Sequence, residues 1–309
     1  MIKYIMIGGI TIDDTIMQNG RVKFNAAGGN AIYSALGANL WADGIGIVGR
    51  VGPDYPEGNL ITLAESGLDV QGIQKVDFPS QHLWLLYEKD GSRQFVFHKN
   101  SGTMDSEIDP VPDQIPEAYQ SAKMAHLSGM GSQAQYALAK YLISHHIDYS
   151  YDITQASLMI DKADYIGNYA TVNSSLLLPS IEEIELIYGQ QPLLPLLRNL
   201  AESGPKYIVV KMGSRGSIAF DSQKNQAYHI PIFPVEVVDP TGAGDAFCGG
   251  FMAGFCESGS LLEAGLYGTV SASFAIQDFG SFHLLDVNKK DALKRLDYVR
   301  KNVEIVPVE

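Results

Sequence analysis

Short apolar segments rich in β-branched residues alternate with longer amphipathic segments along most of the chain. Apolar alternation over a few residues is typical of strands, whereas a helical period over ten or more is typical of helices. The predicted strands lie at residues 3–10, 73–76, 124–128, 149–152 and 207–212, with another near 165–172. The predicted helices lie at residues 30–40, 59–66, 132–145, 246–255 and 265–276, and others begin near 157 and 179. This alternation predicts an α/β fold with a doubly wound, mainly parallel sheet.

Two hairpin patterns interrupt this alternation. Residues 15–24 hold Asn19-Gly20 between two short strand-like runs, and Lys89-Asp90-Gly91-Ser92 joins the runs at 83–87 and 94–98. Such hairpins predict a small sheet standing over the main one, which would act as a lid in an enzyme. We therefore expect one α/β domain over residues 1–309, with a β-sheet lid inserted from about 12–26 and 82–100.

A glycine-rich turn precedes the helix expected at 246–255. Apolar alternation at 231–238 predicts a strand, and Pro240-Thr241-Gly242-Ala243-Gly244 follows with almost no side-chain bulk. Backbone amides in such a turn can approach a ligand closely, and the positive end of the following helix points to the same place. The turn therefore predicts an anion-binding site.

Several polar residues beside glycine turns have two interpretations from the local pattern alone. Asp245 can cap the start of the helix or face the anion that the turn would bind. Asn30, after Gly28 and Gly29, can likewise be part of a plain helix cap or contact a ligand through its amide. The turn after Lys211, with Gly213, Ser214 and Gly216, can be a simple hairpin or a binding loop.

Composition narrows the class of protein. A chain of 309 residues with 46% hydrophobic composition can bury one large core. The net charge of −13 disfavours a nucleic acid or an anionic membrane surface as the main partner. Cys248 and Cys256 lie too far apart along the predicted helix for a disulfide, so reduced thiols and a cytoplasmic protein are expected. The apolar start of the chain has the pattern of a first core strand rather than of a signal peptide.

Other motifs are weaker. The glycines at residues 44–49 match a dinucleotide fingerprint in spacing, but they lie inside a strand pattern instead of opening a helix. His126, His145 and His146 lack a second ligand at metal spacing, which favours ordinary core or surface histidines. Asp13, next to Asp14, follows the first strand, at the edge of an α/β sheet where ligands bind.

Three motifs taken together resemble the ribokinase (PfkB) family of carbohydrate kinases over nearly the whole chain. They are the Gly-Gly-Asn at 28–30 with Gly-Arg-Val-Gly-Pro-Asp at 49–54, the segment at 210–216, and Asp-Pro-Thr-Gly-Ala-Gly-Asp at 239–245. The resemblance implies an ATP-dependent phosphotransferase that acts on a hydroxymethyl group of a sugar, a sugar acid or a nucleoside.

The resemblance also implies roles for individual residues. Asp245 matches the catalytic base of the family, and Gly242, Ala243 and Gly244 match the anion hole. The substrate would be bound by Asp13, Gly28, Gly29 and Asn30. The nucleotide would be bound by Lys211, Gly213, Ser214, Gly216 and Gly280.

The resemblance implies Mg²⁺ as well, with Glu183 in the position of the glutamate of the family's Asn-x-x-Glu motif. Ser180 stands where that motif has Asn, which departs from the family. Asp239 and Thr241 match a monovalent-cation site, such as one for K⁺, that is found in many relatives. The sequence does not decide whether this chain binds such a cation.

Alternatives also stay open. Aromatic residues of the expected lid (Trp84, Tyr87, Phe95 and Phe97) could stack on a base in a nucleoside kinase, and Lys99 would suit an acidic sugar. A non-catalytic, ligand-sensing member is a third hypothesis. A homodimer through the lid edges is compatible with the family.

Overall fold

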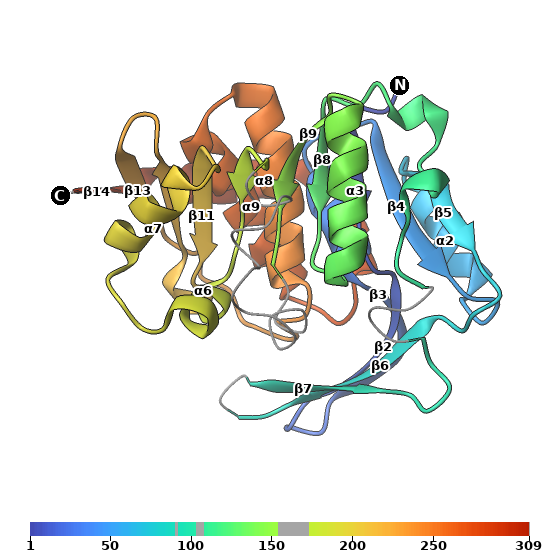
Figure 1. Cartoon of the computed structure of the whole chain (residues 1–309). Helices are drawn as coiled ribbons and strands as arrows, with labels where there is room; N and C mark the ends of the chain where they lie inside the picture. Colours follow the sequence, from blue (N-terminus) through green and yellow to red (C-terminus); the bar gives the residue numbers. More distant parts are fainter. Residues whose placement is uncertain (90–91, 103–107, 154–172, 309) are drawn as a thin grey trace.

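The computed structural model describes residues 1–89, 92–102, 108–153 and 173–308, and its main element is a ten-stranded sheet (Figure 1). The strand order is β14-β13-β12-β11-β10-β9-β8-β1-β4-β5. The strands β11, β10, β9, β8, β1, β4 and β5 run parallel to one another. Each of β12, β13 and β14 pairs antiparallel with the strand that precedes it along the chain. The strands are β1 (Tyr4–Ile7), β4 (Ile45–Val51), β5 (Asp69–Lys75), β8 (Met124–Leu127), β9 (Asp148–Tyr151), β10 (Leu176–Leu177), β11 (Tyr207–Lys211), β12 (Ser217–Asp221), β13 (Gln226–Ile230) and β14 (Glu304–Val306). The mainly parallel sheet that the sequence predicts is confirmed.

Helices cover both faces of this sheet, which explains why its central strands are apolar throughout. One face packs against α1 (Asn30–Asn39), α2 (Glu57–Glu65), α8 (Ala243–Ser258), α9 (Leu261–Ala275) and α10 (Lys289–Lys301). The other face packs against α3 (Ser132–Ser144), α6 (Ile181–Tyr188) and α7 (Leu193–Glu202). Short 3-10 turns lie at Pro112–Gln114, Glu117–Tyr119, Gly213–Arg215 and Phe282–Asp286.

A second, four-stranded sheet projects beneath the carboxyl ends of the parallel strands (Figure 1). We call it the small sheet. Its order is β3-β2-β6-β7, with β2 (Thr11–Ile16), β3 (Val22–Gly28), β6 (Gln81–Tyr87) and β7 (Arg93–Phe97). Gly20, with φ of 85°, sits in the turn between β2 and β3, as the Asn-Gly pattern predicts. This sheet is consistent with the predicted lid.

Two predictions about the segment around α8 are wrong in detail. Residues 231–238 form no strand, because Pro231 and Pro234 lack the N–H groups that a ladder needs. The helix begins at Ala243 rather than at residue 246, and Gly242 is its N-cap, so Asp245 is not the capping residue.

The structure agrees with the prediction for residues 44–49 and does not test the elements expected between residues 157 and 172. Residues 44–49 lie largely within β4, as expected, and open no helix. The helix expected from residue 157 and the strand expected near 165–172 lie outside the described residues. Within the described part of the chain, none of the helices combines the length and the apolar character that crossing a bilayer requires.

Candidate active site

The amino end of α8 forms an open backbone corner. Gly242 has φ of 72°, and a Cβ there would lie 2.2 Å from the ring of Tyr33, so only glycine fits this turn. The helical ladder starts with the amide of Ala246, which donates to the carbonyl of Gly242 at 2.8 Å. The amides of Gly244 and Asp245 therefore precede the ladder, at the positive end of the helix dipole. This corner can bind an anion.

Asp245 lies in the first turn of α8 and is partly buried. Burial, and then the nearby carboxylate of Asp152, raise the pKa of Asp245 to about 6, while Lys211 and Arg93 oppose this shift. A carboxylate with such a pKa is ionised at neutral pH and is a better proton acceptor than an ordinary aspartate.

Asp13 and the glycines before α1 form a second group of candidate site residues. A Cβ at Gly28 would lie 1.8 Å from Oδ2 of Asp13, so the absence of a side chain there makes room for the carboxylate. Thr11 donates a hydrogen bond to Asp13 at 2.6 Å. Burial raises the pKa of Asp13 to about 7, although the hydrogen bond from Thr11 opposes the shift.

Asn30 opens α1 beside these residues, and Gly29 is the N-cap. The side-chain amide of Asn30 donates to the carbonyl of Gly129, while its Oδ1 is buried without a hydrogen-bond partner. Oδ1 also occupies the space that a Cβ of Gly8 would need. An unpaired buried acceptor beside Asp13 is suited to a ligand hydroxyl.

A buried charge cluster lies beneath the α8 corner. Nζ of Lys211, at the end of β11, lies 2.6 Å from Oδ2 of Asp152 and 3.4 Å from Sγ of Cys248. Burial alone would lower the pKa of Lys211, but the interactions with Asp152, Cys248 and Glu183 together outweigh burial and raise it. Lys211 therefore carries a positive charge close to Gly244 and Asp245.

Glu183 belongs to the same cluster. Burial, and then Asp152, raise the pKa of Glu183 to about 7. Ser180 is the N-cap of α6, and its backbone N–H donates to Oε2 of Glu183 at 2.7 Å while its hydroxyl accepts from the amide of Glu183. The Ser that departs from the family motif thus has a helix-capping role here.

The small sheet reaches the α8 corner through Tyr87. Its hydroxyl lies 2.7 Å from Oγ1 of Thr241 and accepts a hydrogen bond from Arg93 at 3.0 Å. Asp239 accepts from the amide of Thr241 through Oδ1, whereas its buried Oδ2 has no hydrogen-bond partner. Although burial opposes it, interactions with Tyr87, Asp245 and Asp239 raise the pKa of Arg93. Arg93 thus brings a positive charge toward the site.

The expected nucleotide-binding residues lie on two separate turns. Gly213, Ser214 and Gly216 form the turn between β11 and β12, directly after Lys211. Gly280 lies on the turn after α9, and a Cβ there would lie 3.1 Å from the Cβ of Ala26 in the small sheet. No hydrogen bond found for the described residues joins these two turns.

Sequence reasoning missed Asp152 and Arg93. Asp152 directly follows β9, so its place at the end of a predicted strand was the available signal. No local pattern predicts that the guanidinium of Arg93 reaches Tyr87, because this contact depends on how the small sheet packs.

His126 is a buried core histidine, as expected, and two groups of possible metal ligands that include histidines come together in space. Ligand atoms of His126, Asp152 and Cys248 lie within 4.8 Å of one another. Asp14, His82 and His98 form a second such group. Each group joins separate elements, which spacing along the chain cannot show.

An α/β sheet covered on both faces, with a glycine corner at a helix end that can bind an anion and a carboxylate in the first turn of that helix, is the arrangement expected of a ribokinase-like phosphotransferase. A model of the pfkB family carbohydrate kinases matches residues 5–287, and the chain belongs to this family.

Proteins similar to this chain are also kinases of sugars or nucleosides. The chain is 29% identical over 284 residues to the cytidine kinase of Thermococcus kodakarensis, covering 92% of this chain and 99% of that protein. It is 26% identical over 310 residues to a 5-dehydro-2-deoxygluconokinase of Mesomycoplasma hyopneumoniae, covering 93% and 90%. An Escherichia coli protein described as Ribokinase II, solved with ATP and Mg²⁺, superposes with a TM-score of 0.78 at 21% identity, covering 96% and 100%. The protein is a phosphotransferase that acts on a hydroxyl group of a sugar or a nucleoside.

Proposed function

We infer that the protein transfers the γ-phosphoryl group of ATP to a hydroxymethyl group, with Asp245 as general base. The observation that carries this proposal is the corner at Gly242, Ala243 and Gly244, which places backbone amides that precede the helical ladder directly before a carboxylate of raised pKa. The E. coli relative solved with ATP and Mg²⁺ supports ATP as the donor.

In the proposed step, the hydroxyl oxygen attacks the γ-phosphorus and its proton passes to Asp245. The bond from that phosphorus to the bridging oxygen of ADP breaks, and ADP leaves with the electron pair. The amides at the amino end of α8 donate hydrogen bonds to the transferring phosphoryl oxygens without moving. Lys211 and Arg93 add positive charge near Asp245.

The acceptor would lie between α1 and the small sheet. The carboxylate of Asp13 and the free Oδ1 of Asn30 can accept hydrogen bonds from its hydroxyl groups. Asp13 shares the inner face of the small sheet with Leu83, Leu85 and Tyr87, because paired strands alternate in register. This apolar face suits a nucleobase better than a sugar acid, and the similarity to a cytidine kinase supports a nucleoside.

The remaining residues would hold the nucleotide and ions. The turn with Gly213, Ser214 and Gly216, together with Gly280, would contact the nucleotide. The carboxylates of Glu183 and Asp152 are the oxygen ligands that Mg²⁺ prefers, and the ion would neutralise phosphate charge. The buried Oδ2 of Asp239 has no hydrogen-bond partner, and with Thr241 it fits a monovalent cation.

The proposal is tested by replacing Asp245 with Asn. Turnover, measured by coupled ADP release over a panel of nucleosides and sugars, should fall about 10²–10⁴-fold, because the general base is lost. ATP affinity, measured by calorimetry, should change less than about threefold. Asp297→Asn, on the exposed surface of α10, is the matched control and should behave as the wild type.

Two results would count against this function. One is unchanged turnover in Asp245→Asn, which would remove Asp245 as the base. The other is a folded wild-type protein that binds ATP but phosphorylates no member of the panel, as a ligand-sensing protein would.

A further inference from the structure

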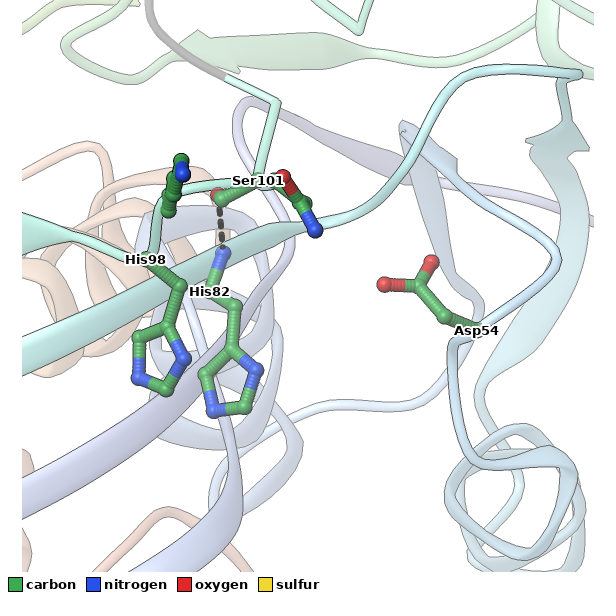
Figure 2. A pocket seen from close by; sticks show the side chains of 6 residues that line it. Asp54, His82, His98 and Ser101 are labelled. Atoms are coloured by element: carbon green, nitrogen blue, oxygen red, sulfur yellow. Dashed lines mark hydrogen bonds between the residues drawn. The ribbon is translucent and has the colours of Figure 1, made fainter.

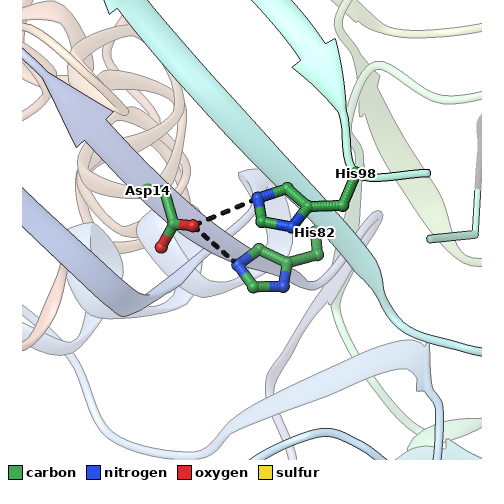
Figure 3. A group of neighbouring side chains, drawn as sticks. All are labelled: Asp14, His82 and His98. Atoms are coloured by element: carbon green, nitrogen blue, oxygen red, sulfur yellow. Dashed lines mark hydrogen bonds and ion pairs between the residues drawn. The ribbon is translucent and has the colours of Figure 1, made fainter. Parts of the chain in front are cut away.

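Asp14, His82 and His98 form a compact cluster on the small sheet (Figure 3). Nε2 of His82 lies 3.0 Å from Oδ2 of Asp14, and Nε2 of His98 lies 3.1 Å from the same oxygen. Asp14 comes from β2, His82 from β6, and His98 directly follows β7. The cluster therefore connects three strands of the small sheet.

This cluster faces away from the proposed substrate site. In the register of β2 and β6, Asp13 pairs with Leu83 whereas Asp14 pairs with Trp84, and neighbouring residues of a strand point to opposite faces. Asp14 and His82 thus lie on the outer face of the small sheet, and Asp13 lies on the inner face.

The ligand spacing corresponds to coordination of one ion. Nitrogen and oxygen ligands at about 2.0–2.2 Å from a zinc-like ion lie roughly 3 Å apart at the edges of the coordination polyhedron. The two distances from Oδ2 of Asp14 to the imidazole nitrogens have this length. Two imidazoles and one carboxylate favour a first-row transition ion over Mg²⁺, which prefers oxygen ligands.

The carboxylate of Asp14 is held in place by the backbone. The amide of Asn25 donates to Oδ1 of Asp14 at 2.7 Å, which fixes the carboxylate and leaves Oδ2 toward the histidines. Nε2 of His98 is buried and makes no contact with hydrogen-bond geometry, although it lies close to Oδ2. A buried nitrogen without a proper hydrogen bond is available to coordinate an ion.

The remaining coordination positions have access to solvent. A cavity of about 330 Å³ adjoins the two imidazoles and is lined by polar groups (Figure 2). The lining residues are Asp54, His82, His98, Lys99, Asn100 and Ser101. Water molecules in this cavity could complete the coordination, and the net charge of −13 attracts cations.

Ion binding requires one ring to turn. The imidazoles of His82 and His98 are stacked with centroids 3.7 Å apart and an interplanar angle of 10°, and the ring of Trp84 stacks on His98 at 4.6 Å. Two parallel rings cannot both direct an in-plane lone pair at the same ion. Rotation of an imidazole about its Cβ–Cγ bond would bring the lone pairs together and change the contact with Trp84.

We propose that Asp14, His82 and His98 bind a divalent transition-metal ion of the zinc type, which ties β2, β6 and β7 together. The site is separate from the Mg²⁺ expected with ATP and does not depend on the proposed function.

The test uses the full chain without a histidine tag, dialysed against a chelator, with no nucleotide present. Zn²⁺ is titrated by calorimetry, and Co²⁺ is followed by its visible absorption. The wild type should bind one equivalent, and His82→Gln and His98→Gln should each weaken binding at least about tenfold. His145→Gln, at the end of α3, is the matched control and should bind as the wild type.

Three results would overturn the proposal. They are binding of less than about a fifth of an equivalent, unchanged affinity in both folded histidine variants, and a cobalt–thiolate charge-transfer band, which would assign the ion to Cys248. Circular dichroism verifies that each variant is folded. If either histidine variant unfolds, the Zn²⁺ affinities of the other histidine variant and of Asp14→Asn test the proposal. Kinase activity is measured separately, so failure of this site and failure of the kinase proposal are distinguishable.

Discussion

Burial raises the pKa values of Asp13 and Asp245, two aspartates to which we assign roles in the proposed reaction. Asp245 has a pKa of about 6 and Asp13 a pKa of about 7. A raised pKa in an acid means that the proton is held more tightly, so the ionised form is lost as the pH falls through that value. Both proposed roles, proton acceptance and hydroxyl binding, need the ionised carboxylate.

The pH dependence of kcat/KM should show this at the scale of single residues. At saturating ATP, kcat/KM should be constant above about pH 8 and should fall as the pH drops, with apparent pKa values near 7 and 6. In Asp13→Asn, the fall near pH 7 should disappear while that near pH 6 remains. A wild-type profile that is flat down to pH 5 would show that neither carboxylate acts as proposed.

At the scale of elements, the glycines of α8 set how closely the helices approach. A Cβ at Gly249 would lie 1.8 Å from the backbone carbonyl oxygen of Ser34, so α8 lies directly on α1. This contact matters for the site, because α1 carries Asn30 and α8 carries Asp245. The contact between α1 and α8 therefore fixes the placement of Asn30 relative to Asp245.

Replacing Gly249 with Ala should destabilise the fold. The added methyl group meets backbone rather than a flexible side chain, so the helices must separate, at a cost of about 2 kcal/mol or more in free energy of unfolding. Urea denaturation measures this change. Gly58→Ala in α2, where a Cβ meets nothing within 4 Å, is the control and should be neutral or stabilising by up to about 1 kcal/mol. Equal stability of both variants would contradict this explanation.

Sequence patterns predicted some helices, strands and turns correctly and one strand wrongly. The alternation of apolar segments predicted the parallel sheet, and Asn19-Gly20 predicted the β2–β3 turn, because hydrophobic periods and turn residues can be identified within short segments of the chain. The strand expected at 231–238 failed, because its alternation was apolar but its prolines cannot join a ladder.

At the scale of the whole molecule, the small sheet and the main sheet meet at the site. Besides the contact of Tyr87 with Thr241, the hydroxyl of Ser281 donates to the carbonyl of Ala27 at 2.7 Å. These contacts position the inner face of the small sheet over the α8 corner. Pairing of two copies through the small sheet remains a prediction.

Tyr87→Phe tests whether the contact between the sheets serves the reaction. Loss of the hydroxyl removes the hydrogen bonds to Thr241 and Arg93, so KM for the acceptor should rise about 3–10-fold, in line with one or two hydrogen bonds. Steady-state kinetics measure this effect. Tyr298→Phe, on the exposed side of α10, is the control. An unchanged KM and kcat would mean that this contact does not position the small sheet for catalysis.

The sequence by itself determined the α/β fold, the hairpins and the glycine corner before Asp245, because helical and strand periods and turn chemistry are local properties. It also determined the family, through motifs that stay contiguous along the chain. Only the tertiary structure decided that Lys211 pairs with Asp152, that Arg93 reaches the site, and that Asp14 meets His82 across 68 residues. These contacts depend on strand order and register, and a local pattern contains neither.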